Sequence, residues 1–383
     1  MELTLLAALP AALIASNLAS IALAASRLRR RKPIAPPDGE AAAVSIVVPA
    51  RGIEPFTAET LERAFSLDWP CYELIFCVAQ PDDPVALMIT DAMARFPTVP
   101  ARLLIGDDRF SANPKLNNCI KGWEAARHDW VILADSNVLM PADYIQHLMA
   151  AWREGTGLVC STPIGSRPAG FWAEVECAFL NTLQARWQYA GEALGLGFAQ
   201  GKSMLWNKPM LDANGGIRAL AAEIAEDAAA TKLVNGIGLR VNLVAAPFEQ
   251  PLGRRSLGDI WSRQARWARL RRVTFPLFFL PEILTGVAVP LALALVAADA
   301  AGFSLAATAV AVLAAAYLPE CALAWTKGWY MSPRMVAAMM VRDLLLPAIW
   351  ARGWLGGAVD WRGNAMTIRT KAMTELEETP SIT

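Results

Sequence analysis

Three aspartates in this 383-residue chain stand after apolar stretches and are candidates for chemistry: Asp83, Asp135 and Asp227. A carboxylate in such a position can bind a cation, accept a proton from a hydroxyl group or cap the N-terminus of a helix. One of them alone is a weak signal, since helix capping explains it equally well. Their order along the chain, followed by the basic residues of 263–272, is better evidence for a shared site.

The basic residues are five arginines: Arg263, Arg266, Arg269, Arg271 and Arg272. They can flank the next apolar segment on the cytosolic side of a membrane. They can also place positive charge against the phosphates of an activated donor. Arg266 lies further from the apolar run than a flank requires, so we expect both uses. With the aspartates, the cluster offers what a nucleotide-sugar reaction needs, which is charge against the diphosphate and a base for the acceptor hydroxyl.

The segments that must position these residues alternate between strand and helix patterns. Short apolar runs predict strands at 43–50, 72–78, 101–105 and 130–134. A stretch with charges on one face predicts a helix at 57–66, between the first two strands. This alternation predicts an α/β fold with a mostly parallel sheet. Asp83 and Asp135 then lie at the carboxyl edge of the sheet, where such folds bind ligands.

Five stretches in this order resemble the ceramide glucosyltransferase family. They are CVAQPDDP (77–84), NPKLNN (113–118), DSN (135–137), IAED (224–227) and RQARW (263–267). Together they match the three-aspartate pattern of that family, closed by its (Gln/Arg)-x-x-Arg-Trp motif. The similarity runs from about residue 44 to 275 and extends loosely into the apolar segments. It implies a catalytic domain of the GT-A type and an inverting sugar transfer.

The resemblance also implies a role for each matching residue. Asp83 would contact the nucleotide, Asp135 would hold a divalent cation (Mg²⁺ or Mn²⁺) that bridges the phosphates, and Asp227 would be the general base. Further roles are implied for the nucleotide pocket (Lys115, Asn117, Asn118) and for closing the site beside the diphosphate (Arg263, Arg266, Trp267). The metal motif is Asp-Ser-Asn and lacks the second aspartate of Asp-x-Asp, which predicts weaker cation binding.

Apolar segments surround this domain, in a chain that is 55% hydrophobic and 18% charged. Residues 3–26 carry no charge and as a helix would reach about 36 Å, enough for a hydrocarbon core of roughly 30 Å. Basic residues follow at 27–32, so we expect an anchor at 1–27 with the chain entering the cytosol after it. A cleaved signal peptide is the alternative, but basic residues do not precede this apolar run.

The C-terminal third predicts a second membrane region. The stretches 273–298 and 301–325 each contain one charge and are expected to cross the bilayer. The stretch 335–357 contains Arg342, Asp343 and Arg352, so we expect it to lie in the interface or to re-enter from it. The predicted organisation is therefore a cytosolic domain at 33–272, a membrane region at 273–360 and a cytosolic tail at 361–383. Composition favours a bacterial inner membrane.

These observations predict the transfer of glucose from UDP-glucose to the primary hydroxyl of ceramide. Alternatives are another donor (UDP-glucuronate, UDP-galactose or a UDP-N-acetylhexosamine) or another lipid (a diacylglycerol or a hopanoid). A processive polysaccharide synthase shares the Arg-x-x-Arg-Trp motif but needs more membrane helices. The zero net charge gives no reason to expect nucleic acid, and six scattered cysteines and two histidines predict neither disulfides nor a zinc site.

Overall fold

A seven-stranded mixed sheet forms the centre of the protein, seen in a computed structural model that describes residues 2–37, 41–355, 358–361 and 364–367. Its strand order is β3-β2-β1-β4-β7-β5-β8. The strands are β1 Val44–Ala50, β2 Tyr72–Val78, β3 Ala101–Ile105, β4 Trp130–Ala134, β5 Thr156–Cys160, β7 Ser203–Asn207 and β8 Arg240–Leu243. The first four are parallel, and β7 runs antiparallel to both β4 and β5. The four strands predicted from the sequence are confirmed, as is the α/β fold.

Helices cover both faces of the sheet because alternate side chains of each strand point to opposite sides. On one face, Val44 and Ile46 of β1 belong to a core with α2 Thr57–Ala64, α3 Pro84–Arg95 and α5 Tyr144–Ala150. On the other, Val47 joins α4 Pro114–Ala125, α7 Arg186–Ala193 and α9 Glu226–Gly236. The N-terminal helix α1 Glu2–Arg27 also reaches this second core through its last turns.

The remaining elements stand beside the sheet. Strands β6 Ile164–Ala169 and β9 Glu249–Arg254 pair in parallel, and β10 Ala358–Trp361 pairs with β11 Asn364–Thr367. One long helical segment runs through α6 Phe171–Cys177, a π-helical stretch Ala178–Ala185 and α7. The other helices here are α8 Lys208–Asp212, the 3₁₀ helix Ile217–Ala222 and α10 Leu257–Thr274.

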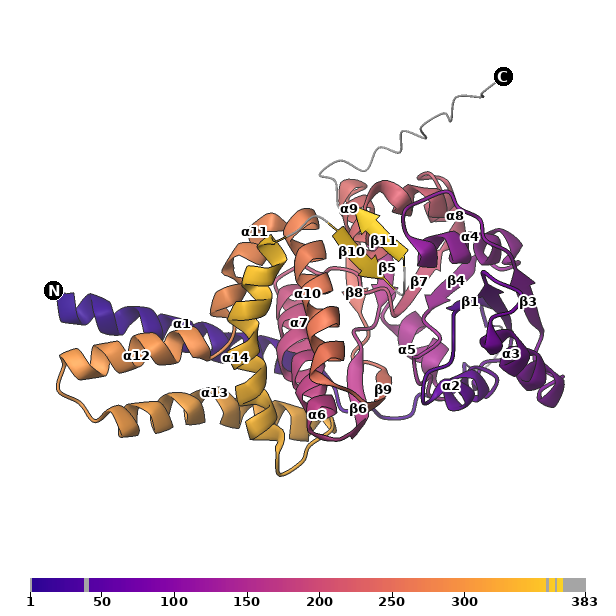
Figure 1. Ribbon diagram of the computed structural model, residues 1–383. Coiled ribbons are helices and arrows are strands. Elements are labelled where there is room, and N and C mark those ends of the chain that lie inside the picture. Colours follow the sequence, from indigo (N-terminus) through magenta and orange to yellow (C-terminus); the bar gives the residue numbers. More distant parts are fainter. Residues whose placement is uncertain (1, 38–40, 356–357, 362–363, 368–383) are drawn as a thin grey trace, which may run out of the picture.

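Three apolar helices project together away from the α/β domain (Figure 1). They are α1, α12 Ala288–Ala300 and α13 Leu305–Lys327. In the described residues, Ala7–Arg27 and Leu305–Lys327 are each long and apolar enough to cross a membrane. The stretch 273–298 is broken into α11 Pro276–Phe279, a 3₁₀ helix Leu280–Leu284 and α12, with a bend of 47° between Pro276–Leu284 and α12. It would therefore cross as a broken span or enter and return.

Helix α14 Met335–Trp354 follows α13 in the chain and packs along the α/β domain against α10 and α6 (Figure 1). Its charged residues Arg342 and Asp343 are buried in protein contacts. Among the described residues α14 is not one of the helices that pass the length and hydropathy test for a span. The predicted tail, 361–383, lies almost entirely outside the described residues.

The ends of α1 and α13 nearest the α/β domain meet through Lys327, which donates hydrogen bonds to the carbonyl oxygens of Ala25 (3.1 Å) and Leu28 (2.9 Å). Because Lys327 and the basic residues of 27–32 lie at the same end of the two helices, we expect the α/β domain on the cytosolic side. A fluorescent reporter fused near residue 150 should be bright, and an alkaline phosphatase fused there should be inactive. The reverse pattern would contradict this topology.

Candidate active site

A cavity of about 1880 Å³ opens at the carboxyl edge of β1, β2 and β4 and extends towards the apolar helices. It exceeds the usual size of a small-molecule site, roughly 300–1,000 Å³, and has room for two substrates. The structure brings all nine predicted site residues to its wall: Asp83, Lys115, Asn117, Asn118, Asp135, Asp227, Arg263, Arg266 and Trp267.

Asp135 follows β4 directly and is held between two lysines. Its carboxylate oxygens lie 2.6 Å from the ammonium of Lys115 and 2.7 Å from that of Lys202. Lys202 reaches it because β7 pairs with β4, and the amide of Asp135 donates to the carbonyl of Lys202. Burial alone would raise the pKa of Asp135, but the two ammonium groups bring that pKa well below its usual range. Asp135 is therefore an anion, and both of its oxygens are in ion pairs.

Lys115 lies between two carboxylates at the start of α4. Besides Asp135 it contacts Glu226, 2.7 Å away, and it donates to the carbonyl oxygen of Gly201. Burial alone would lower the pKa of Lys115, but Asp135 and Glu226 raise it above the ordinary value of a lysine. A side chain at Gly201 would not fit, because its Cβ would lie 2.6 Å from a Glu226 carboxylate oxygen. The backbone here must pass close to the ion pair.

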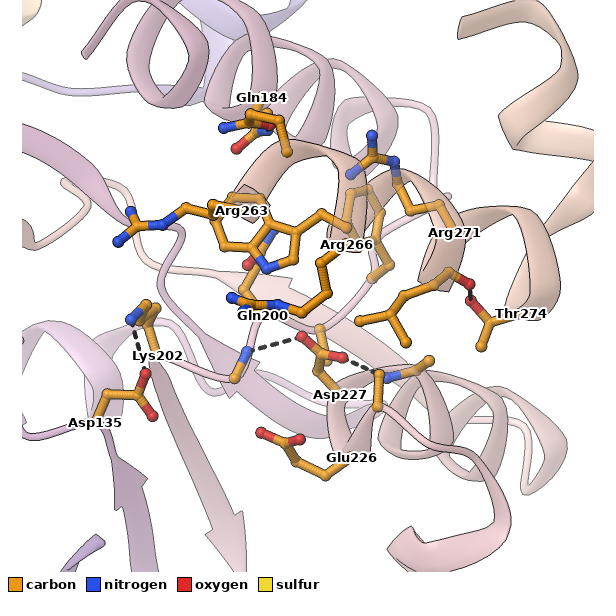
Figure 2. A pocket seen from close by; sticks show the side chains of 18 of the residues that line it. Asp135, Gln184, Gln200, Lys202, Glu226, Asp227, Arg263, Arg266, Arg271 and Thr274 are labelled. Atoms are coloured by element: carbon orange, nitrogen blue, oxygen red, sulfur yellow. Dashed lines mark hydrogen bonds and ion pairs between the residues drawn. The ribbon is translucent and has the colours of Figure 1, made fainter. Parts of the chain in front are cut away.

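Asp227 lies in the first turn of α9, and Figure 2 shows it apart from Asp135, which lies beside Lys202. Its carboxylate accepts hydrogen bonds from the backbone N–H groups of Gly201 (3.1 Å) and Ala228 (2.9 Å). Burial and the neighbouring charge of Glu226 raise the pKa of Asp227 to about 6, against the opposing effect of Lys115. A carboxylate with a pKa near the operating pH suits general-base chemistry.

The remaining residues of the nucleotide side shape the cavity wall through hydrogen bonds within the protein. Asp83 caps α3 by accepting from Val85 N–H (3.0 Å), and it also accepts from Gly52 N–H (2.9 Å). Asn117 holds the preceding loop at Ser111. The side-chain amide of Asn118 donates to the carbonyl of Cys77 (2.6 Å). These contacts fix the loops after β1, β2 and β3 around the cavity.

Helix α10 contributes the residues of the RQARW stretch from above the two aspartates (Figure 2). It starts with a capping box, in which Ser256 and Asp259 satisfy each other's backbone N–H groups. Arg263 lies 2.9 Å from the buried Glu176, and its guanidinium is 5.8 Å from the centre of the Trp267 ring. Arg266 points into the cavity between Gln200 and the helix.

The divalent cation predicted at Asp135 meets a donor set that does not fit it. Among the described residues, no group of three or more Asp, Glu, His or Cys side chains is placed to hold a metal ion. Asn137, the third residue of the motif, accepts from Lys202 at 2.9 Å through the side-chain oxygen that it would offer to a cation. A cation would have to displace lysine from Asp135 and take most of its ligands from elsewhere. No step of the chemistry below is therefore routed through a metal.

The far end of the cavity is apolar and belongs to the membrane helices. Leu13 and Leu23 of α1 line it, together with Phe278 and Leu284 from the broken segment and Leu346 of α14. Several of these lie within or next to the segments that can cross a membrane. One continuous space thus joins the carboxyl edge of the sheet to the apolar helices that are long enough to cross a membrane.

Sequence reasoning missed Lys202, Arg255 and Gln200, which also line the cavity. Lys202 lies in none of the matched motifs. Its position depends on the antiparallel pairing of β7, which no local sequence pattern predicts. Arg255 lies just ahead of α10 and is the one of the three with a usable signal, because it extends the arginine cluster towards its N-terminal side. Glu226 was part of the matched IAED stretch but had no assigned role.

A model of the family described as glycosyl transferase family 21 matches residues 8–374. Ceramide glucosyltransferase 3 of Caenorhabditis elegans is 28% identical over 266 residues, which are 69% of this chain and 58% of that protein. Ceramide glucosyltransferase of Komagataella phaffii is 40% identical over 115 residues, 29% of this chain and 22% of the relative. The chain therefore spans little more than half the length of the nematode relative.

Among solved structures, mannosyltransferase PcManGT from Pyrobaculum calidifontis, in complex with GDP-Man and Mn²⁺, is 20% identical. The superposition has a TM-score of 0.47 and covers 88% of this chain and 99% of the mannosyltransferase.

Proposed function

The chain belongs to glycosyl transferase family 21, and from this premise we propose that it transfers glucose from UDP-glucose to the primary hydroxyl of ceramide at the cytosolic face of a membrane. The observation that carries the proposal is the single cavity that has charged residues at the sheet edge and apolar residues on membrane helices. A water-soluble donor and a lipid acceptor can meet there without either leaving its own phase.

The polar end of the cavity suits a nucleotide-sugar donor. Asp83 stands at the carboxyl end of β2, and the loops beside it leave a recess for a base and ribose. Lys202 and Arg263 place positive charge further along the wall, towards Asp227, where a diphosphate would lie. Along the wall the nucleotide would come first, the diphosphate next and the general base Asp227 last, so the sugar would lie beside Asp227.

The reaction needs one displacement. The acceptor hydroxyl oxygen attacks the anomeric carbon of the sugar, its proton passes to a carboxylate oxygen of Asp227, and the bond from that carbon to the diphosphate oxygen breaks. The electron pair of this bond leaves with UDP. Two backbone N–H groups hold the carboxylate of Asp227 in place before the reaction.

The acceptor half of the proposal rests on the apolar wall and on the relatives named ceramide glucosyltransferase. A ceramide would keep its chains among α1, the broken segment and α14 and present its head group to Asp227. The same wall accepts a diacylglycerol or a hopanoid, and the same polar end accepts other UDP-sugars. Donor and acceptor identity therefore need a direct assay.

We expect purified protein in detergent to move label from UDP-[¹⁴C]glucose into an organic-extractable product only when ceramide is present. The panel pairs labelled UDP-glucose, UDP-galactose, UDP-glucuronate and UDP-N-acetylglucosamine with ceramide and diacylglycerol. Thin-layer chromatography and mass spectrometry identify the product. Label transferred preferentially from another donor or to another lipid would replace this substrate pair, and label in a water-soluble polymer would contradict lipid glycosylation altogether.

A further inference from the structure

We propose that the side chains of Lys202 and Arg255, with Arg263, supply the positive charge that binds the donor diphosphate, so that UDP binds without a divalent cation. The inference rests on the proposed nucleotide-sugar donor. In this proposal, positively charged side chains take the role that the Asp-Ser-Asn motif predicts for a divalent cation.

The first support is the position of Lys202. Its ammonium lies 2.7 Å from Asp135 and 2.9 Å from the side-chain oxygen of Asn137, the first and third residues of the motif. A cation bound by this motif would contact these same two side chains. The second oxygen of Asp135 is 2.6 Å from Lys115, so two ammonium groups already neutralise the carboxylate.

The second support is that Lys202 is one of several cations on the same wall. Arg255 and Arg263 line the cavity together with it. The charge of Arg263 acts unfavourably on both Lys202 and Arg255, which means that like charges are gathered close together. Asp135 and Glu176 already offset part of this repulsion through their ion pairs with Lys202 and Arg263, and a bound dianion would offset more of it.

The third support is an unused donor. In the described structure the Nε atom of Arg255 is shielded from solvent and has no hydrogen-bond partner. Buried donors are nearly always paired in folded proteins, and leaving one unpaired is unfavourable. A phosphate oxygen is the partner that arginine recognises best. Arg255 directly precedes α10, so it stands where the chain passes from β9 to the helix that carries Arg263.

The experiment measures UDP affinity by calorimetry on the purified full-length protein, once with excess EDTA and once with excess MgCl₂ or MnCl₂. We expect the two Kd values to agree within about twofold. Lys202→Met and Arg255→Met should each weaken UDP binding by about tenfold or more, because each removes a charge-assisted hydrogen bond. Lys202→Arg should recover part of the loss. Lys208→Met is the matched control, since Lys208 donates to the backbone carbonyls of Trp123 and Ala126.

Uridine separates loss of the phosphate contact from loss of the fold. We expect Lys202→Met to bind uridine as the wild type does, because uridine has no diphosphate. UDP binding that needs the metal, or a Kd for UDP unchanged in both Lys202→Met and Arg255→Met, would overturn the inference and leave the proposed transfer standing. Failure of the wild type to bind UDP under every condition would instead contradict the proposed donor and, with it, the inference.

Discussion

Asp227→Asn should lower turnover by about 10² to 10⁴ while UDP-sugar affinity stays nearly unchanged. The substitution keeps the shape of the side chain and one oxygen, which can accept one of the two hydrogen bonds that Gly201 and Ala228 donate to different carboxylate oxygens. It removes the group that takes the acceptor's proton. Because Figure 2 shows Asp227 apart from Asp135 and Lys202, the diphosphate side of the cavity should be little disturbed.

The measurement is turnover and UDP affinity on the same Asp227→Asn preparation. The matched control is Glu223→Gln, since Glu223 forms its ion pair with Lys232 and does not line the cavity. A surface carboxylate of that kind usually contributes under about 0.5 kcal/mol to stability, so this control should turn over normally. Near-normal turnover of folded Asp227→Asn would remove Asp227 from the mechanism.

The pH profile offers an independent check on the same residue. The base must be deprotonated, and its pKa of about 6 lies above the ordinary range of aspartate. Turnover should therefore hold above pH 6 and fall towards tenfold per pH unit below it. The charge of Glu226 raises the pKa of Asp227, and the charge of Lys115 lowers it. Lys115→Met should accordingly move the acidic limb of the kcat profile to higher pH.

Local patterns predicted the strands of the sheet because burial on both faces demands near-continuous apolar runs. Once the strands were placed, the positions of Asp83 and Asp135 at the same edge followed from parallel pairing, and the structure has them lining one cavity. The sequence alone does not tell whether an aspartate after a strand caps a helix or lines a site. Asp83 does both, so neither interpretation of that residue excluded the other.

Contacts between distant segments were beyond the same reasoning. The pairing of β7 with β4 brings Lys202 to Asp135, and it depends on the whole chain between them. The break in the stretch 273–298 is a different case. Pro276 and Pro281 lie inside it, and a proline interrupts a helix however apolar the surrounding sequence is. Hydropathy measures transfer into lipid and does not report whether a helix continues.

The charge inside α13 also has an explanation that only packing provides. Glu320 is 2% exposed and lies 2.8 Å from both Arg186 of α7 and Arg342 of α14. Arg342 in turn lies 2.7 Å from Asp343. Two positive and two negative charges thus balance where the membrane helices meet the α/β domain. Apolar context made these charges look out of place in the sequence, whereas together they join α13 and α14 to α7, which lies far from both along the chain.

Glu320→Ala should therefore destabilise the protein by about 3–5 kcal/mol, because it leaves Arg186 and Arg342 buried with Asp343 as their remaining carboxylate. Glu320→Gln keeps hydrogen-bond acceptance but not the charge, so its loss should be smaller. The control is Glu62→Ala, which removes a solvent-exposed pair with Arg95 and should cost about 0–1 kcal/mol.

Unfolding of the three variants in the same detergent, followed by circular dichroism, checks the predicted order of their stabilities. Equal stability of Glu320→Ala and Glu62→Ala would mean that water reaches the cluster and screens it. The predicted order follows mainly from burial, because Glu320 is paired with two arginines that are shielded from solvent, whereas Glu62 is paired with the exposed Arg95. The difference between them measures how strongly burial ties α13 to α7 and α14, and hence how firmly the apolar wall of the cavity is held against its catalytic edge.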